Sequence, residues 1–190
     1  MRGELVETIK VEDGKIFNLT WHNRRLNSSR LALFNQREAL NLAHYIEAPQ
    51  KGLFRCRILY EERVKSVEFI PYTPKKIEYL KVVKSNISYP YKRSDRSEIQ
   101  ELLANYNEII IEKAGYLTDT SIANIAFYNG KRWITPKKPL LEGTTRARLI
   151  DEGFLKLDNI SKEQIKNYSH FALMNAMIGF QIQKSINIRL

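Results

Sequence analysis

Two prolines about two-fifths of the way along the chain divide it into two parts. Pro71 and Pro74 enclose Tyr72-Thr73 and are followed by Lys75-Lys76. Proline fixes its own φ and favours extended backbone at the residue before it, so the segment is typical of a connector between folded parts. We therefore expect two domains, residues 1–74 and residues 75–190.

Strand and helix patterns occur on both sides of this connector. Before it, apolar alternation and turn residues predict strands over 5–11, 15–19, 54–60 and 64–70, a helix from Trp21 to Asn35 capped by Thr20, and a second helix over 36–46. After it they predict strands over 77–83, 108–112, 121–128, 131–135 and 181–189, helices over 96–105 and 145–151, a short helix from Ser161, and a strand or helix over 171–178. The class is therefore α/β or α+β in two domains.

Composition excludes several kinds of protein. Hydrophobic residues make up 43% of the chain, which is too many for a disordered protein. One cysteine excludes a disulfide framework within the chain, and three dispersed histidines make a metal site unexpected. Glu4 and Glu7 interrupt any signal-peptide pattern, and no apolar run approaches the ~18 residues of a membrane helix. We expect a cytoplasmic protein with no membrane partner.

The formal net charge of +10 has two interpretations. It could mark a surface for nucleic acid or anions, or it could belong to an ordinary solvated surface. The basic residues are scattered, and no run of five like charges occurs. We favour the solvated surface and expect no nucleic-acid partner, which leaves a non-enzymatic basic binding protein as the outside alternative.

Two segments carry candidate cations. His22 and Arg25 are three residues apart in the first predicted helix, so they share a face where Arg25 could hold an anion. Lys92 lies in Tyr91–Arg96 among arginines, whose charge favours the nucleophilic amine. Taken singly, each is also consistent with a solvated surface residue.

Two further segments place small polar groups at element ends. Asp119 lies in the polar run Gly115–Ile125, just before an apolar strand, which also suits ordinary turn chemistry. Gly143, Thr144 and Thr145 precede a helix, where free N–H groups and hydroxyls form a phosphate cradle or a helix cap with nothing bound.

The four segments in this order resemble the class IV aminotransferases. The patterns are H-x-x-R-L, a lysine, G-x-x-T-D-x-x-x-x-N and L-x-G-x-T-R, and Leu5–Ile9 is similar to the F-E-T-I strand of that family. The resemblance covers nearly the whole chain. The family comprises pyridoxal-phosphate enzymes of fold type IV, including branched-chain and D-amino-acid aminotransferases and 4-amino-4-deoxychorismate lyases. It implies two small domains of the D-amino-acid aminotransferase-like fold, a site in the cleft between them, and a homodimer.

The resemblance also implies roles for particular residues. Lys92 matches the Schiff-base lysine, and Asp119 stands where the family has a glutamate facing the pyridine nitrogen. The matches to the phosphate-binding groups are Arg25, Thr144 and Thr145, with Asn175 and Ala176 in a second phosphate loop. Asp119 is one methylene shorter than the family residue, so either the ring lies closer or the strand shifts.

The resemblance implies a reaction on a small amine or amino acid. K-x-x-D-R at Lys92 and Asn175-Ala176 are similar to the lyases, which convert 4-amino-4-deoxychorismate to 4-aminobenzoate and pyruvate in folate synthesis. The alternative with the same cofactor is a branched-chain or D-amino-acid transaminase.

Overall fold

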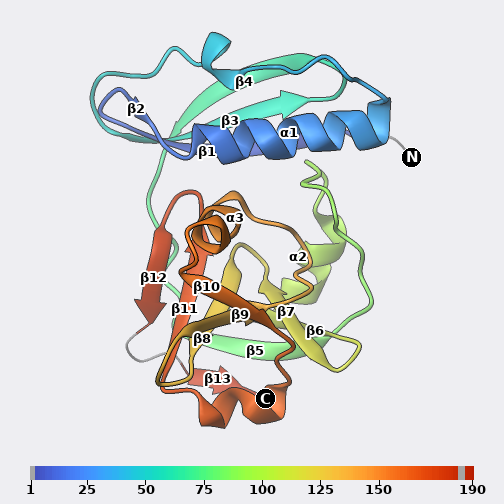
Figure 1. Ribbon diagram of the computed structural model, residues 1–190, viewed down its shortest axis with the longest axis vertical. Helices are drawn as coiled ribbons and strands as arrows, with labels where there is room; N and C mark the ends of the chain where they lie inside the picture. The colour runs from blue at the N-terminus through green and yellow to red at the C-terminus, as the bar shows by residue number, and fades with distance from the viewer. Residues whose placement is uncertain (1–2, 184–186) are drawn as a thin grey trace. The chain divides into compact units, whose positions relative to one another are not determined.

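The computed structural model describes residues 3–183 and 187–190, and the chain forms two compact units (Figure 1). Unit 1 comprises the chain up to Pro74 together with Tyr91–Asp95, and unit 2 comprises Lys75–Pro90 and Arg96–Leu190. Each unit contains one sheet and at least one helix, which confirms the mixed α/β class. The chain leaves unit 1 after Pro74, where the predicted boundary lies, but residues 91–95 return to unit 1.

Unit 1 is an antiparallel sheet with one long helix on its face (Figure 1). The strands are β1 (Leu5–Glu12), β2 (Lys15–Ile16), β3 (Leu53–Tyr60) and β4 (Val64–Pro71), in the order β2-β1-β3-β4. Alternate residues of β1 and β3, such as Ile9 and Ile58, are fully buried against Leu26 of helix α1 (Leu19–Phe34). This burial explains why the period-2 pattern predicted both strands.

Helix α1 begins and ends at asparagines. Asn18 and Asn35 both have left-handed backbone, with φ values of 54° and 56°. Asparagine adopts this conformation more easily than most residues, so it can close a helix at either end. The end predicted at Asn35 is confirmed, whereas the cap predicted at Thr20 is wrong, because Asn18 turns the chain and Thr20 lies inside the helix. The same turn limits the second predicted strand to Lys15–Ile16.

The helix predicted over 36–46 does not form. Only a short 3-10 helix, η1 (Leu42–His44), lies there. Side chains of α1 bind the backbone of this segment: Arg30 Nη1 donates to Glu38 O at 2.7 Å, and Asn27 Oδ1 accepts from Leu40 N at 2.9 Å. Backbone groups bound in this way cannot also form helical hydrogen bonds.

Unit 2 is built on a larger sheet. The strands are β5 (Tyr79–Lys84), β6 (Ile109–Lys113), β7 (Tyr116–Thr120), β8 (Asn124–Tyr128), β9 (Trp133–Pro136), β10 (Leu155–Asp158), β11 (His170–Asn175), β12 (Gly179–Gln183) and β13 (Asn187–Arg189). Neighbouring strands follow the order β10-β9-β8-β7-β6-β5-β13, and off this path β11 pairs with both β8 and β12. The run Ile109-Ile110-Ile111 is fully buried, because Ile110 faces one apolar cluster while Ile109 and Ile111 face another. Burial on both faces explains the absence of polar alternation in β6.

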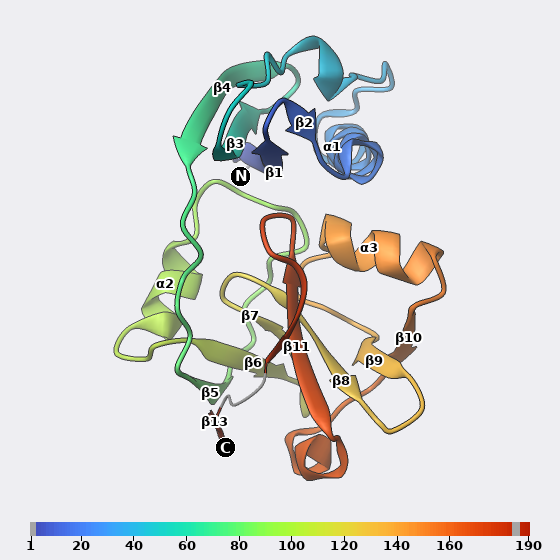
Figure 2. The same ribbon diagram turned by 90° about the vertical axis from the view of Figure 1, so that its left-hand side faces the viewer.

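Three helical segments accompany this sheet (Figure 2). α2 (Ser97–Leu103) packs its buried Ile99 against Ile109 and Ile111 of β6, and α3 (Thr144–Asp151) packs against β10 and β11. The capping box predicted at Ser161 is confirmed at the start of the 3-10 helix η2 (Lys162–Asn167). Strands β7 and β10 were not predicted, and the strand predicted over 121–128 begins at Asn124.

The described residues after Ser169 form three strands and a turn. The segment predicted as strand or helix over 171–178 forms β11, followed by a turn. The strand predicted over 181–189 is divided between β12 and β13, and residues 184–186 lie outside the described residues.

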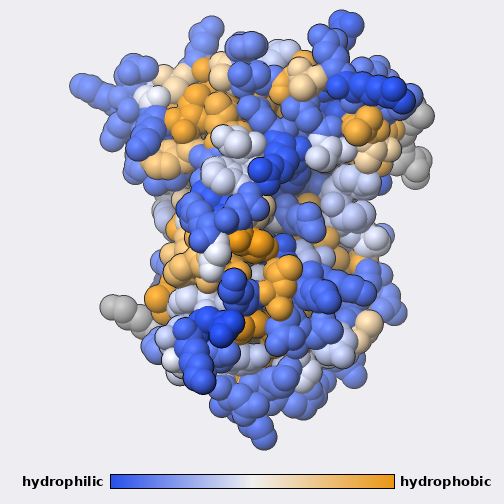
Figure 3. Space-filling model, viewed as in Figure 1, coloured by the Kyte–Doolittle hydropathy of each residue, from blue (hydrophilic) through white to orange (hydrophobic). Residues whose placement is uncertain are grey.

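The visible surface of both units is mainly hydrophilic, with apolar side chains in smaller patches (Figure 3). No helix in the described part of the chain is long and apolar enough to cross a membrane.

Candidate active site

A buried ion pair joins β1 to α1 in unit 1. Glu7 of β1 is fully buried and binds Arg25 of α1 through two hydrogen bonds, Nε to Oε1 at 2.8 Å and Nη2 to Oε2 at 2.6 Å. His22, one turn before Arg25 and also fully buried, donates from Nδ1 to Glu7 Oε2 at 2.5 Å. The helix positions i and i+3 therefore aim both side chains at one carboxylate.

The charges in this cluster follow from its contacts. Burial alone would raise the pKa of Glu7, but the nearby Arg25 charge and the His22 hydrogen bond outweigh it and lower that pKa to about 2. Burial lowers the pKa of His22 and the Arg25 charge adds to this, against the opposing effect of Glu7. At neutral pH Glu7 is therefore a carboxylate bound to Arg25, and His22 is a neutral donor.

Lys92 lies beside the same cluster. The backbone of residues 91–95 pairs with the start of β1: Val6 N donates to Lys92 O and Ser94 N donates to Glu4 O, both at 2.9 Å. The Lys92 ammonium is close enough to His22 for its charge to lower the pKa of that imidazole. Thus Lys92, predicted to lie in the second domain, belongs to the unit that holds Arg25.

In unit 2, Asp119 is held at the end of β7. It is 4% exposed and faces Asn124, its partner in the β7–β8 pair. Asn124 Nδ2 donates to Asp119 Oδ1 and Leu141 N donates to Oδ2, both at 2.8 Å. The Leu140 backbone also binds this carboxyl. A carboxylate has about four acceptor sites, so Asp119 can still accept a hydrogen bond from a ligand.

Burial raises the pKa of Asp119 to about 7. The hydrogen bonds from the Leu141 amide and Asn124, and the charge of Arg146, lower this pKa but do not offset the lost hydration. A cationic ring nitrogen at this carboxyl would favour its ionised form, since opposite charges stabilise each other in a desolvated site.

The start of α3 forms a cradle close to Asp119. Gly143 caps the helix, and Thr144 and Thr145 are its first two residues and are buried. Thr145 Oγ1 has no hydrogen-bond partner among the described residues. A Cβ at Gly143 would lie 2.0 Å from Asn124 Oδ1, so only glycine fits against the amide that binds Asp119.

Asn175 and Ala176 form a turn between β11 and β12. Asn175 Oδ1 accepts from Met177 N at 2.9 Å and from Ile178 N at 3.0 Å, which closes the turn. Its Nδ2 donates to Ile122 O at 3.2 Å, in the turn that follows β7. Asn175 therefore joins two loops of unit 2 by its side chain, and the second N–H of its Nδ2 as well as the backbone of this loop can donate to a phosphate.

The structure groups the predicted site residues into two sets. Arg25 and Lys92 lie together in unit 1, and Asp119, Thr144 and Thr145 lie together in unit 2 with Asn175 one turn away. Sequence reasoning missed the part played by Glu7, although a glutamate among the alternating apolar residues of a strand signals a buried charge. The motif G-x-x-T-D-x-x-x-x-N ends at Asn124, but the hydrogen bonds of Asn124 and of the Leu141 amide to Asp119 were not predicted.

Comparison with known proteins identifies the family. The sequence profile of "Amino-transferase class IV" matches residues 84–186, which is more than half of the chain. The chain belongs to the class IV aminotransferase family. Arg25, upstream of the matched region, resembles the family pattern only through the motif already described.

Relatives of this family cover nearly the full chain. A protein of Haemophilus influenzae of uncharacterized function is 37% identical over 92% of this chain and 98% of its own length. A crystal structure from Haemophilus somnus, named "putative 4-amino-4-deoxychorismate lyase", has a TM-score of 0.85 and 34% identity, and covers 94% of this chain and 98% of that chain.

Family members bind pyridoxal phosphate. A hypothetical aminotransferase from Mycobacterium tuberculosis, solved in a form with this cofactor bound, has a TM-score of 0.79 to this chain at 14% identity, over 97% of this chain and 81% of that chain. At that identity the likeness shows the fold, which is the fold of type IV transaminases.

Proposed function

We propose that this protein is a pyridoxal-phosphate-dependent 4-amino-4-deoxychorismate lyase, which forms 4-aminobenzoate and pyruvate. The observation that carries the cofactor assignment is the buried Asp119 carboxyl, held by two donors next to the glycine-capped start of α3. A carboxylate with remaining acceptor capacity beside a helix N-terminus suits a cationic ring nitrogen and a phosphate on one ligand.

The residues present fit this cofactor. Thr145 Oγ1 is a buried hydroxyl without a partner among the described residues, and the first amides of α3 lie beside it. Arg25 supplies a cation whose direction is set by its two bonds to Glu7. We assign the phosphate to Arg25, Thr144, Thr145 and the backbone near Ala176, and the ring nitrogen to Asp119. Pairing of the two sets around one cofactor is part of the proposal.

Each residue then has a distinct task. Bound pyridoxal phosphate supplies an electron sink for the carbon acid of the substrate. Asp119 keeps a proton at the ring nitrogen, which maintains the pull of the ring on electrons. Lys92 Nζ is the covalent attachment point and, once released, the base that takes the proton from the substrate ring. Glu7 holds Arg25 in position and takes no part in proton transfer.

The lyase is favoured over the transaminase by two short patterns and one relative. Lys92 is followed by Asp95-Arg96, and Asn175 by Ala176, as in the lyases. The Haemophilus somnus structure that carries the lyase name is 34% identical. The transaminase is the second candidate because the same Lys92 and Asp119 would serve it, and the Mycobacterium tuberculosis structure is named an aminotransferase.

One assay separates these reactions. Purified protein loaded with pyridoxal phosphate is given 4-amino-4-deoxychorismate, or a panel of L- and D-amino acids with 2-oxoglutarate. We expect 4-aminobenzoate and pyruvate from the first and little glutamate from the second; the reverse outcome selects the transaminase.

The attachment point is tested directly by borohydride reduction and peptide mapping. We expect the pyridoxyl group on Lys92 and its loss in Lys92→Ala, with Lys84→Ala as the control on β5. A label that stays on another lysine in both variants contradicts the assignment, and a protein with no visible absorbance after loading contradicts the cofactor itself.

A further inference from the structure

Unit 2 contains a cavity of about 580 Å³ that the proposed reaction does not use. It is enclosed by residues 88–90, the hairpin that joins β6 to β7, the loop 137–140 after β9, and residues 158–159 at the end of β10. Its volume lies in the range of roughly 300–1,000 Å³ that is usual for small-molecule sites. All four walls come from one unit, so the cavity is complete within that unit.

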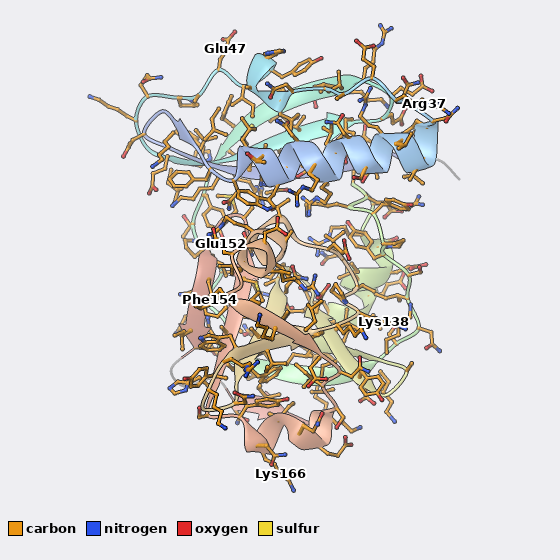
Figure 4. The ribbon with its side chains drawn as sticks, in the orientation of Figure 1. Arg37, Glu47, Lys138, Glu152, Phe154 and Lys166 are labelled. Carbon is orange, nitrogen blue, oxygen red and sulfur yellow. The ribbon has the colours of Figure 1, made fainter. Side chains whose placement is uncertain are left out.

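The charge around this cavity is mainly positive. Lys113, Lys137 and Lys138 line it, and Asp158 is the one acidic residue among the described lining residues. Lys113 is partly buried, and its Nζ donates to Ile87 O at 2.6 Å. An ammonium has three N–H donors, so this bond fixes the cation in place while donor capacity for an anion remains. Figure 4 shows Lys138 on the same side of unit 2 as β6 and β7.

The remaining walls are aromatic and apolar. Tyr89 is 8% exposed and Tyr116 is 46% exposed, so one ring forms an inner wall and the other lies at the mouth. Leu117 and Leu140 are buried and complete the inner surface. Tyrosine rings accept the flat face of another ring, and their hydroxyls provide polar contacts at one end. The lining therefore suits a small ring compound that carries negative charge.

This cavity is separate from the Asp119 carboxyl, although the two share a loop. Leu141 N donates to Asp119, and the neighbouring Leu140, which lines the cavity, also binds that carboxyl through its backbone. Thr118 also lines the cavity, and its hydroxyl donates to Ile111 O at 2.9 Å, so it does not take part in holding Asp119. The walls therefore share Leu140 with the support of Asp119 and leave out its donors Asn124 and Leu141.

We propose that this cavity is a second ligand site, which binds a small aromatic dicarboxylate. The lysines bind the carboxylates, and the tyrosine and leucine side chains pack against the ring. The site needs no cofactor, so it stands or falls independently of the lyase assignment.

The test uses isophthalate as the probe and isophthalamide, its uncharged counterpart of the same shape, as the control ligand. Each is titrated into ¹⁵N-labelled full-length protein and followed by amide chemical shifts. We expect saturable shifts at residues 88–90, 113–118, 137–140 and 158–159 with isophthalate, and binding at least about tenfold weaker with isophthalamide, because charge-assisted hydrogen bonds are lost. The same shifts persist after the protein is loaded with pyridoxal phosphate.

Matched variants identify the cations responsible. Lys137→Gln/Lys138→Gln is expected to weaken isophthalate binding about tenfold, while Lys166→Gln, an exposed lysine on η2 outside the cavity, leaves it unchanged (Figure 4). The proposal is overturned if isophthalate causes no saturable shifts, if isophthalamide binds equally well, if shifts appear mainly elsewhere, or if loading with pyridoxal phosphate abolishes them.

Discussion

The pKa values of Glu7 and Asp119 are shifted in opposite directions, because the two carboxyls have different neighbours. Both carboxyls are buried. At Glu7 the Arg25 charge and the His22 hydrogen bond lower the pKa to about 2. At Asp119 the effect of burial dominates and the pKa is about 7, because the N–H donors, and the charge of Arg146, which acts less strongly than the Leu141 and Asn124 bonds, do not offset it. A cation at contact distance outweighs desolvation, and neutral donors do not.

We predict that the contribution of Asp119 to the free energy of unfolding of the cofactor-free protein falls as pH rises. Its folded pKa is above its unfolded value of 3.8, so the folded state binds more protons between about pH 4 and 7, and its contribution to the free energy of unfolding falls across that window. Asp119→Asn should remove this fall, which is on the order of 3 kcal/mol. Urea unfolding at pH 4.5 and pH 8 measures it.

For each protein, the change in the free energy of unfolding between pH 4.5 and pH 8 is the informative quantity, because Asp119→Asn also changes stability at both pH values. Asn124 and Leu141 donate to different carboxylate oxygens, and in the amide one of these positions is an NH2 group that cannot accept, so one hydrogen bond is lost at every pH. Asp158→Asn, at an exposed position, is the control and should retain the wild-type slope. An unchanged slope in Asp119→Asn would show that the carboxyl titrates normally. With cofactor bound, turnover of this variant should fall by orders of magnitude.

Glu7→Gln is predicted to weaken unit 1 and the phosphate site together. Removing the carboxylate leaves the partly buried Arg25 without its ion-pair partner in Glu7, at a cost of about 2–4 kcal/mol at pH 7. The folded pKa of Glu7 is below its unfolded value, so its contribution is complete above about pH 4.5 and is lost as pH falls toward 2. Wild type and variant should therefore converge in acid.

Chemical unfolding from pH 7 to 2.5 provides the measurement, and Glu12→Gln provides the control on the same strand. The side chain of Glu12 is 41% exposed and pairs with Lys10, so its loss should cost about 1 kcal/mol or less. A constant difference between wild type and Glu7→Gln at every pH would contradict the low pKa.

At the level of elements, helix α3 is positioned by a close approach at its first turn. Gly143 has φ −71° and ψ 144°, which any residue can adopt, so its backbone does not require glycine. The requirement comes from Asn124, whose Oδ1 would lie 2.0 Å from a new Cβ. A propensity argument alone misses this constraint.

Gly143→Ala is predicted to displace the Asn124 amide and break its bonds to Asp119 and Leu141. We expect a loss of about 1–3 kcal/mol in the free energy of unfolding, together with a changed pKa of Asp119 in a carboxyl NMR titration. Ala147→Gly inside α3 is the control: it costs about 1 kcal/mol through helix propensity and leaves that titration unchanged. Equal titrations in the two variants would contradict the proposed close approach.

Local patterns predicted most elements, and long-range polar contacts explain the errors. Alternation identified β1 and β3 because one face of each is buried, and Asn35 marked the end of α1 through its left-handed backbone. The segment 36–46 carried helix-like spacing, but Arg30 bound its backbone from another element. Such a bond leaves no mark in the spacing of residues 36–46.

At the level of the whole molecule, the chain passes between its two units three times. The motifs indicated Arg25, Lys92, Asp119, Thr144 and Thr145 from the sequence, since each resembles a family pattern. The sequence did not indicate that Lys92 lies in unit 1, because the bonds that place it join residues 4–6 to residues 92–94, and nothing local encodes that pairing.

The assignment of residues 91–95 to unit 1 can be measured by native-state hydrogen exchange. Leu26→Ala removes a fully buried side chain from the unit 1 core and should lower the opening free energy of the Ser94 amide by about 2–4 kcal/mol. Leu173→Ala makes the same truncation in the unit 2 core and should leave the Ser94 amide unchanged. Equal effects of both variants would show that the units unfold as one.

The bond between Val6 N and Lys92 O has a consequence for anyone who recombines this chain with a relative. A crossover placed after Pro74 would take β1 from one parent and residues 91–95, which pair with the start of β1, from the other. Lys92 would then sit beside a foreign glutamate, histidine and arginine. A working chimera needs two additional junctions, one after Pro90 and one before Arg96, so that Lys92 comes from the same parent as the rest of unit 1.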